Sequence, residues 1–270
     1  MGQNTPPMSP VAWMSKSYPD IVDTAEEDGS MVIVPVGSTE QHGHHLPVST
    51  DTLLVESVAH AGAAQVRGSV PVLVMPTVWS GRSPHHLPFG GTISLRTTTL
   101  LSTLSEIADT ALENGFDALL FLNGHGGNMS VVSDGVTEVG DRHPDREILG
   151  LTYFHLAETV IDDIRESDPG GISHGGELET SLMLHVHPEL VERDRITGTR
   201  RDEPYELGRQ DLFVDGPLAV YRTFDEYSQS GAIGAPELAT ADKGRQLFEH
   251  LQSELGDLLC EIHTQNTGHA

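Results

Sequence analysis

The sequence predicts an α/β fold: one domain in which a mostly parallel sheet is flanked by helices on both faces. Short apolar runs bounded by turn residues indicate buried strands, and segments with apolar residues at helical spacing separate them. Strands that alternate with helices in this way are typical of parallel sheets. The 270 residues show no change in composition that would mark a linker. We therefore expect a single domain over 1–270, with residues 1–10 forming a flexible arm.

The expected strands are apolar runs too short to be helices. The clearest are residues 31–36 and 118–122, which contain no polar side chain and read as strands buried on both faces. A hairpin is also expected within 211–224. In chain order, the expected strands cover residues 31–38, 72–78, 92–95, 117–122 and 148–154.

The expected helices show apolar residues every three or four positions. Gly68 and Gly115 end two of them, because glycine readily adopts the conformation that closes a helix. Asn128 is the expected N-cap of another. The single Cys260 lies among leucines at helical spacing, which indicates a buried structural thiol. In chain order, the expected helices cover residues 17–22, 51–66, 98–114, 128–140, 177–185 and 238–264.

Acidic residues greatly outnumber basic ones. Asp and Glu number 40 against 15 Lys and Arg, the formal net charge is −25, and Lys16 and Lys243 are the only lysines. The carboxylates are scattered, which indicates an acidic solvated surface resembling that of proteins from salt-loving organisms. Such a surface disfavours nucleic acids and anionic membranes as partners. No run reaches the ~18 apolar residues of a membrane span, and residues 1–10 lack a signal-peptide pattern, so we expect a cytoplasmic, halophilic protein.

The loop after the first expected strand has the residue types of a metal site. It carries Glu40, His42, His44 and His45, and Asp51 follows at the start of the next helix. Loops at the carboxyl ends of strands are where chemistry sits in open α/β sheets. Imidazole nitrogen and carboxylate oxygen suit Zn, Mn, Fe or Co, and a carboxylate can bridge two metals. A histidine-rich surface loop is the alternative interpretation of this stretch alone.

Two later loops repeat this chemistry. His125 lies between glycines directly after an apolar strand; a phosphate-binding loop is the alternative, but the stretch has no lysine and lacks the glycine spacing of such loops. His174 is followed by two glycines and then by Glu177 and Glu179, which open a helix. Residues two apart on a helix point in different directions, so at most one of these carboxylates can reach a shared centre. The other would interact favourably with the helix N-terminus.

Together these motifs resemble those of the creatininase family of metal-dependent amidohydrolases. The resemblance covers roughly residues 10–260, and several motifs occur in the family's order. The matching stretches are Glu-Gln-His-Gly-His-His-Leu-Pro over 40–47 with Asp51, Asn-Gly-His-Gly-Gly-Asn over 123–128, His-Gly-Gly-Glu-Leu-Glu-Thr-Ser over 174–181, a variant of Phe-Pro-Gly-Thr over 89–95, and a glycine-rich stretch over 231–236.

The resemblance implies a pair of divalent metal ions, Zn, Mn or Fe. Family members hold them with residues that correspond to Glu40, His42, Asp51 and His125, and the aspartate bridges the two ions. Creatinine-hydrolysing members use a further glutamate at a position occupied here by Gly127. The chain departs from the family pattern at this ligand.

Glu177 is the residue that we expect to replace the missing ligand, because related members with glycine at that position carry a glutamate in the His-Gly-Gly-Glu motif. Glu179 is then expected to support the helix start or to lie behind the ligands. His174 resembles the family's proton-transferring histidine, so the predicted catalytic residues are His174 and Glu177. The candidate substrate contacts are His44, His45, Gly126 and Gly127. For His85 and His86 a substrate contact, a subunit contact and a solvated face are all open.

The expected activity is metal-dependent hydrolysis of a C–N amide bond, other than a peptide bond, in a small cyclic amide or formamide by a dinuclear metal-activated hydroxide. The alternatives are a metallopeptidase that trims a small peptide-derived cofactor precursor and a non-catalytic metal-binding scaffold. Creatinine is disfavoured, because creatinine-hydrolysing members carry tryptophans just before the histidine that His174 resembles, and none lies there. The resemblance also implies a homo-oligomer, with a hexamer suggested.

Overall fold

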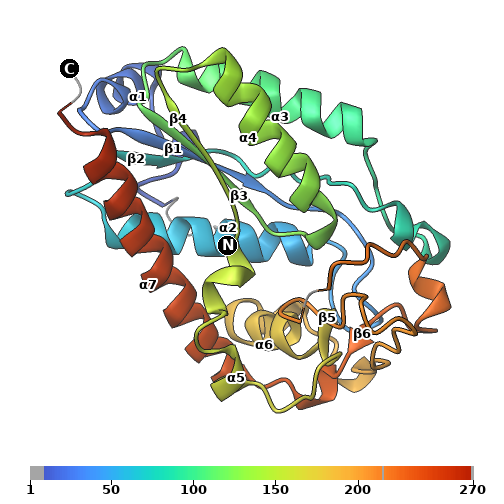
Figure 1. Cartoon of the computed structure of the whole chain (residues 1–270). Helices are drawn as coiled ribbons and strands as arrows, with labels where there is room; N and C mark the ends of the chain where they lie inside the picture. Colours follow the sequence, from blue (N-terminus) through green and yellow to red (C-terminus); the bar gives the residue numbers. More distant parts are fainter. Residues whose placement is uncertain (1–8, 215, 269–270) are drawn as a thin grey trace, which may run out of the picture.

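A four-stranded parallel sheet lies at the centre of the molecule (Figure 1). The computed structural model describes residues 9–214 and 216–268. β1 pairs with β3 along its whole length, from Met31 beside Ala118 to Val36 beside Asn123. This register brings the carboxyl ends of the two central strands to the same edge of the sheet. The strands, in spatial order, are β2 (Val72–Val74), β1 (Met31–Val36), β3 (Ala118–Asn123) and β4 (Glu147–Thr152).

Helices cover both faces of this sheet (Figure 1). One hydrophobic cluster joins alternate strand residues such as Ile33 and Leu120 to α2 and α7, and the other joins Val34 and Phe121 to α3 and α4. Because both faces are covered, every residue of β1 and β3 is buried. The helices are α1 (Tyr18–Ala25), α2 (Thr50–Gln65), α3 (Thr97–Leu112), α4 (Met129–Arg142), α5 (Ile161–Ile164), α6 (Glu177–Val186) and α7 (Ala241–Asn266).

A small antiparallel pair lies beyond the carboxyl ends of the central strands (Figure 1). It consists of β5 (Ile172–His174) and β6 (Ile233–Gly234). β5 runs through Gly175 and Gly176 into α6. Gly175 has φ +57° and a side chain there would press on the backbone of His42, so any other residue would be strained at this position. This turn brings the start of α6 against the loop that follows β1.

The predicted fold class is confirmed, and most elements lie where the sequence places them. Two expected strands differ. The strand over 72–78 ends at Val74, because Pro76 has no N–H to donate, and only a single bridge at Val78 continues the pairing to Val36. The expected strand over 92–95 is wrong: it is an extended segment with one bridge, between Ile93 and Thr39.

Two further expectations are wrong. No hairpin forms among the described residues of 211–224, because the Asp211 carboxylate accepts the N–H groups of Phe213 and Val214 and folds the chain into a turn. Cys260 is exposed rather than buried. The buried stripe of α7 runs through Leu255 and Leu259, and the residue after Leu259 points away from it. Of the predicted arm over 1–10, residues 1–8 lie outside the described residues.

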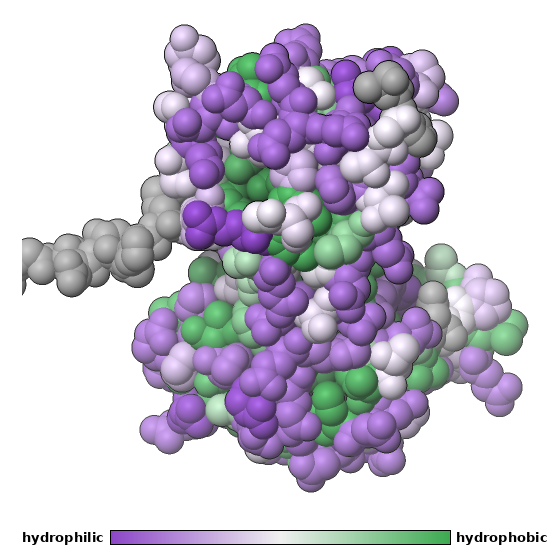
Figure 2. Space-filling view, turned by 90° about the vertical axis from the view of Figure 1, so that its left-hand side faces the viewer, coloured by the Kyte–Doolittle hydropathy of each residue, from purple (hydrophilic) through white to green (hydrophobic). Residues whose placement is uncertain are grey.

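The surface is strongly polar, in keeping with the net charge of −25. Figure 2 shows hydrophilic side chains over most of the face that it displays, with hydrophobic side chains in smaller patches between them. Among the described residues, no helix is both long and apolar enough to cross a membrane. The predicted compartment and salt adaptation stay predictions.

Candidate metal centre

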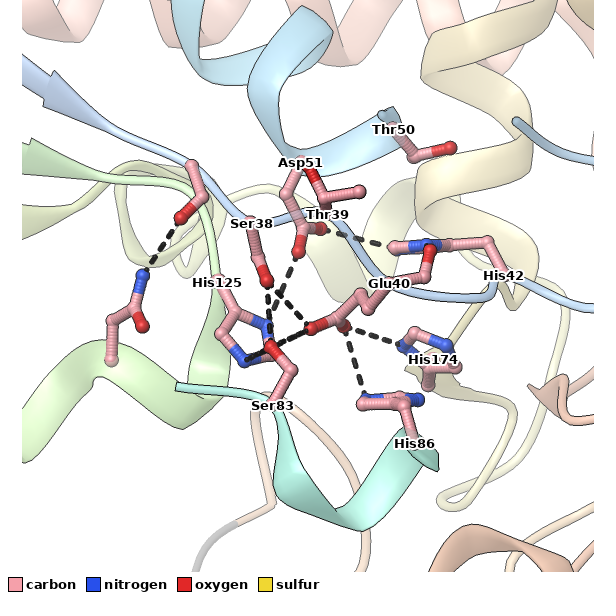
Figure 3. A network of polar contacts seen from close by, with 12 residues as sticks. Ser38, Thr39, Glu40, His42, Thr50, Asp51, Ser83, His86, His125 and His174 are labelled. Carbon is pink, nitrogen blue, oxygen red and sulfur yellow. Dashed lines mark hydrogen bonds and ion pairs between the residues drawn. The ribbon is translucent and has the colours of Figure 1, made fainter. Parts of the chain in front are cut away.

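Glu40, Asp51 and His125 converge at the carboxyl ends of the two central strands (Figure 3). Glu40 lies on the loop after β1, Asp51 lies in the first turn of α2, and His125 comes two residues after β3. Glu40 Oε2 is 3.1 Å from His125 Nε2, and Asp51 Oδ2 is 3.2 Å from His125 Nδ1. Three buried ligand atoms from three segments therefore lie within 4.8 Å of one another.

A second group of ligand atoms shares Asp51 with the first. His42 Nε2 lies 3.1 Å from Asp51 Oδ1, and Glu179 Oε1, from the first turn of α6, lies 3.8 Å from the same nitrogen. These three atoms also lie within 4.8 Å of one another. Each oxygen of the Asp51 carboxylate thus faces a different group, which is the arrangement that a carboxylate bridging two cations adopts.

Two buried oxygens test whether these residues suit a cation. Glu40 Oε1 lies 3.1 Å from His86 Nε2, and Asp51 Oδ2 lies 3.2 Å from His125 Nδ1. Neither oxygen has a hydrogen-bond partner among the described residues. Buried polar atoms normally have one. Oxygens that face imidazole nitrogens without bonding to them are arranged like the ligand atoms around a metal ion. The site therefore suits divalent metals that accept nitrogen and oxygen ligands.

The charges at this centre favour a cation. Burial would lower the pKa of His125, but Glu40 and Asp51 raise it to about 10. Burial would also lower the pKa of His42, yet Asp51 and Glu179 raise it well above its ordinary value. Two imidazoles that hold a proton this firmly indicate a strongly negative potential. A divalent metal ion bound to the same atoms would meet that potential in place of the protons.

His174, at the end of β5, lies beside both groups and forms a third group of possible ligands with Glu40 and His42 (Figure 3). Its Nε2 is 2.6 Å from the backbone oxygen of Gln41 and donates to it, which leaves Nδ1, 3.6 Å from Glu40 Oε1, as the acceptor nitrogen. Burial and the imidazoles of His42 and His86 hold the pKa of His174 well below its ordinary value. A neutral imidazole at this place can accept a proton during a reaction.

Comparison with known proteins places this centre in a family. The family model for creatininase, described as creatinine amidohydrolase, matches residues 15–259. The chain belongs to the creatininase family. A solved structure described as creatininase Mn matches with a TM-score of 0.79 and 26% identity, over 93% of this chain and 98% of that one. A mutant creatininase described as the Zn–Zn type has the same TM-score and identity.

Curated relatives in the creatininase family carry different names. The mycofactocin precursor peptide peptidase of Mycobacterium ulcerans is 33% identical over 225 residues, which cover 82% of this chain and 80% of the relative. The creatinine amidohydrolase of Pseudomonas putida is 28% identical over 253 residues, which cover 86% of this chain and 89% of the relative. The chain is therefore a creatininase-family hydrolase, with a cluster of residues able to bind metal.

The Glu177 carboxylate does not face the groups of possible ligands in this creatininase-family centre. It accepts the N–H groups of Glu166 and Ser167, each at 2.9 Å, and lies 2.5 Å from Lys243 Nζ. Glu177 belongs to none of the ligand groups among the described residues. The two carboxylates leave α6 in different directions, and Glu179 is the one that faces His42.

Gly127 leaves no room for a side chain beside His125 in this creatininase-family centre. A side chain at residue 127 would overlap with His125 Nε2 and with the backbone oxygen of Arg82. Asn128 is the N-cap residue of α4, as the sequence predicts. Its side chain donates to the Gly37 carbonyl and accepts the Arg82 N–H, and so holds the loop rather than the helix N–H groups. Residue 127 has no room for a carboxylate, whereas Glu179 belongs to a group of possible ligands with His42 and Asp51.

A cavity of about 130 Å³ opens beside the possible metal ligands of this chain. Gly126, Gly127 and His174 line it. The described residues that line it do not include His44 or His45. His44 is exposed, whereas His45 is buried, with Nε2 3.0 Å from Thr180 Oγ1. His45 therefore connects the ligand loop to α6 rather than facing this cavity.

Sequence reasoning missed three side chains that surround Glu40 in this centre (Figure 3). Ser38 and Ser83 donate to Glu40 Oε2, and His86, fully buried, lies with Nε2 3.1 Å from Glu40 Oε1. The Gln41 side chain donates to His86 Nδ1 at 2.9 Å and to the backbone oxygen of Gly231 at 3.1 Å. The one signal for His86 was its place three residues before the Phe-Gly-Gly segment, which is this chain's variant of the Phe-Pro-Gly-Thr stretch.

Proposed function

We propose that this chain hydrolyses a C–N amide bond of a small substrate with the help of two divalent metal ions. The observation that carries the proposal is the Asp51 carboxylate, whose two oxygens face separate groups of buried ligands. Glu40, Asp51 and His125 would hold one ion, and His42, Asp51 and Glu179 would hold the other. Zinc, manganese and iron suit these ligands, and the Mn and Zn–Zn creatininase structures support the first two.

The chain's own residues then have distinct tasks. Two bound ions would polarise the amide carbonyl. They would also lower the pKa of water enough to supply hydroxide at neutral pH. His174 takes up a proton at Nδ1 and passes it to the leaving nitrogen, which makes the amine a better leaving group. Gln41 holds His174 in the required tautomer through its backbone oxygen. Gly126 and Gly127 expose their backbone to the substrate. A non-catalytic scaffold is disfavoured, because a purely structural site does not need a cavity lined by a neutral imidazole.

A peptidase acting on a small peptide is the second candidate. It is favoured by the 33% identity to the mycofactocin precursor peptide peptidase of M. ulcerans, which exceeds the 28% identity to creatinine amidohydrolase. Both activities use the same ligands and the same proton carrier, since a peptide bond is itself an amide. They differ in what the cavity accepts.

A substrate screen distinguishes the two candidates. The metal-loaded protein is assayed at high salt with creatinine, formamides, cyclic amides and short peptides, and His174→Ala serves as the control. Turnover of formamides or cyclic amides that depends on His174 supports the amidohydrolase, and turnover of peptides alone supports the peptidase. Turnover of no amide by a fully metal-loaded protein contradicts both.

We also propose a homo-oligomer, with a hexamer suggested by the family resemblance. Light scattering at high salt tests this, because salt screens the self-repulsion of a chain with a net charge of −25. A mass of 29.1 kDa, that of one chain, rejects the proposal.

A further inference from the structure

A larger cavity adjoins the one beside the metal ligands. It measures about 440 Å³, against about 130 Å³ for the inner cavity. His85, Arg201, Arg209 and Phe224 line both, so the two spaces share a wall of four side chains. A molecule held in the outer cavity can therefore extend past this wall toward His174 and the ligands.

The outer cavity has the opposite charge from the rest of the chain. Four arginines line it: Arg82, Arg201, Arg209 and Arg222. The whole chain has only 15 basic residues against 40 acidic ones, yet the described residues that line this cavity include no Asp or Glu. Guanidinium groups side by side repel one another, and acidic residues are abundant enough to neutralise them. An arginine-lined cavity is therefore unusual in such a chain, and its potential favours anions.

Two of the arginines lie over the same aromatic ring. Arg201 lies over the Tyr227 ring at 5.2 Å and pairs with Glu203, whose side chain is fully buried, at 3.4 Å. Arg201 Nε is buried and has no hydrogen-bond partner among the described residues. Arg222 lies over the same ring at 5.7 Å. Guanidinium groups held by aromatic stacking are pre-organised for carboxylate or phosphate oxygens, which they bind with two parallel N–H donors.

We propose that the outer cavity binds a carboxylate or phosphate group carried by the substrate at the end remote from the scissile amide. The substrate class is then an anionic amide, with its amide group in the inner cavity and its acidic group among the arginines. This inference rests on the proposed hydrolysis and adds the chemistry of the substrate's other end. The volume of the outer cavity leaves room for several atoms besides the anion. Creatinine, which has no acidic group, would not use it.

Matched substrates test the proposal. Formanilide, 4-formamidobenzoate and 4-formamidophenyl phosphate carry the same amide with no anion, a carboxylate or a phosphate. We expect the wild type to prefer at least one anionic amide by tenfold or more in kcat/KM. In Arg209→Gln and Arg222→Gln, the ratio of kcat/KM for that anionic amide to kcat/KM for formanilide should fall about tenfold, because charged hydrogen bonds are lost. Arg200→Gln is the matched control, since Arg200 pairs with Asp168 on the surface and lines neither cavity.

Binding of inorganic phosphate, measured by calorimetry on the metal-loaded protein at constant salt, separates this inference from the proposed hydrolysis. Phosphate should bind the wild type and Arg200→Gln alike and bind Arg209→Gln and Arg222→Gln at least tenfold more weakly. That result without turnover of any amide would support the anion site and contradict hydrolysis. Turnover with no preference for anionic amides, together with phosphate binding that is equal in all four proteins, would overturn the anion site. Equal binding would place phosphate on the metal ions alone.

Discussion

The Nε2 atom of His42 lies 3.8 Å from Oε1 of Glu179, although these residues are 137 positions apart and belong to different halves of the chain. The contact exists because Gly175 and Gly176 turn the chain sharply between β5 and α6. The Glu179 carboxylate is also held by the N–H of Gly175, which donates to Glu179 Oε2 at 2.5 Å. Glu179, rather than Glu177, thereby completes the second group of ligands.

Glu179→Gln is predicted to lower the metal content from about two ions to about one per chain, because an amide does not replace an anionic ligand. Glu177→Gln is the matched control on the same helix. It should keep both ions but lower the free energy of unfolding by about 1–3 kcal/mol, since Lys243 would lose its buried partner. Metal analysis after gel filtration and denaturant unfolding at constant salt measure the two effects. Metal loss in Glu177→Gln alone would contradict the assignment.

His174→Ala is predicted to reduce kcat by about 10²–10⁴-fold, the usual contribution of a positioned general acid or base. Its metal content should stay at the wild-type value, because Glu40 and His42 each belong to another ligand group that does not include His174. Steady-state kinetics and metal analysis on the same sample check both statements. A variant that loses metal in parallel with activity would show that His174 is a ligand.

His86→Ala is predicted to weaken metal binding by about 10–100-fold, because residues behind the ligands orient them. His86 Nε2 faces Glu40 Oε1 at 3.1 Å, and its removal frees the Glu40 side chain to turn. Competition with a chelator measures the affinity, with His187→Ala at the end of α6 as the control. Unchanged affinity in His86→Ala would mean that the two serines alone hold Glu40.

The imidazole of His45 makes the fold sensitive to acid. Burial, together with the nearby His42 and His44 imidazoles, lowers its pKa from 6.5 to about 4. Between pH 6.5 and about 4, His45 therefore binds a proton in the unfolded chain but not in the folded chain. The stability contributed by neutral His45 is complete above pH 6.5 and is lost as the pH falls toward 4, by at most about 1.4 kcal/mol per pH unit.

Denaturant unfolding of the wild type and of His45→Gln, at constant high salt, measures this contribution. Between pH 6.5 and 4, the wild type should lose more stability than the variant, whose amide does not titrate. The acidic surface titrates equally in both proteins, so the difference isolates His45. Parallel curves for the two proteins would contradict the assignment.

The sequence predicted much of this molecule because its strongest signals are local. The apolar run that forms β1 and the one that forms β3 are strands with no competing interpretation, and parallel pairing brings the loops of Glu40 and His125 to one edge. Asp51 follows from its place in the first turn of α2. For these parts, residue pattern and strand order are enough.

What the sequence could not predict depends on contacts between distant segments. The choice between Glu177 and Glu179 depends on the orientation of α6, which is set by its packing against α7 and by Lys243. The burial of His86 depends on how the loop before it folds over Glu40. Cys260 lies one residue beyond the buried stripe of α7, which periodicity alone does not resolve.

The number of divalent ions bound per chain, in the wild type and in Asp51→Asn, tests the shared ligand most directly. Asp51 is the residue whose two oxygens face both ligand groups, so the wild type should bind about two ions and Asp51→Asn should lose both. Metal analysis of the folded proteins, with circular dichroism to confirm that the variant is folded, gives the count. One ion in the wild type, or two ions retained in a folded Asp51→Asn, would contradict a dinuclear centre bridged by Asp51.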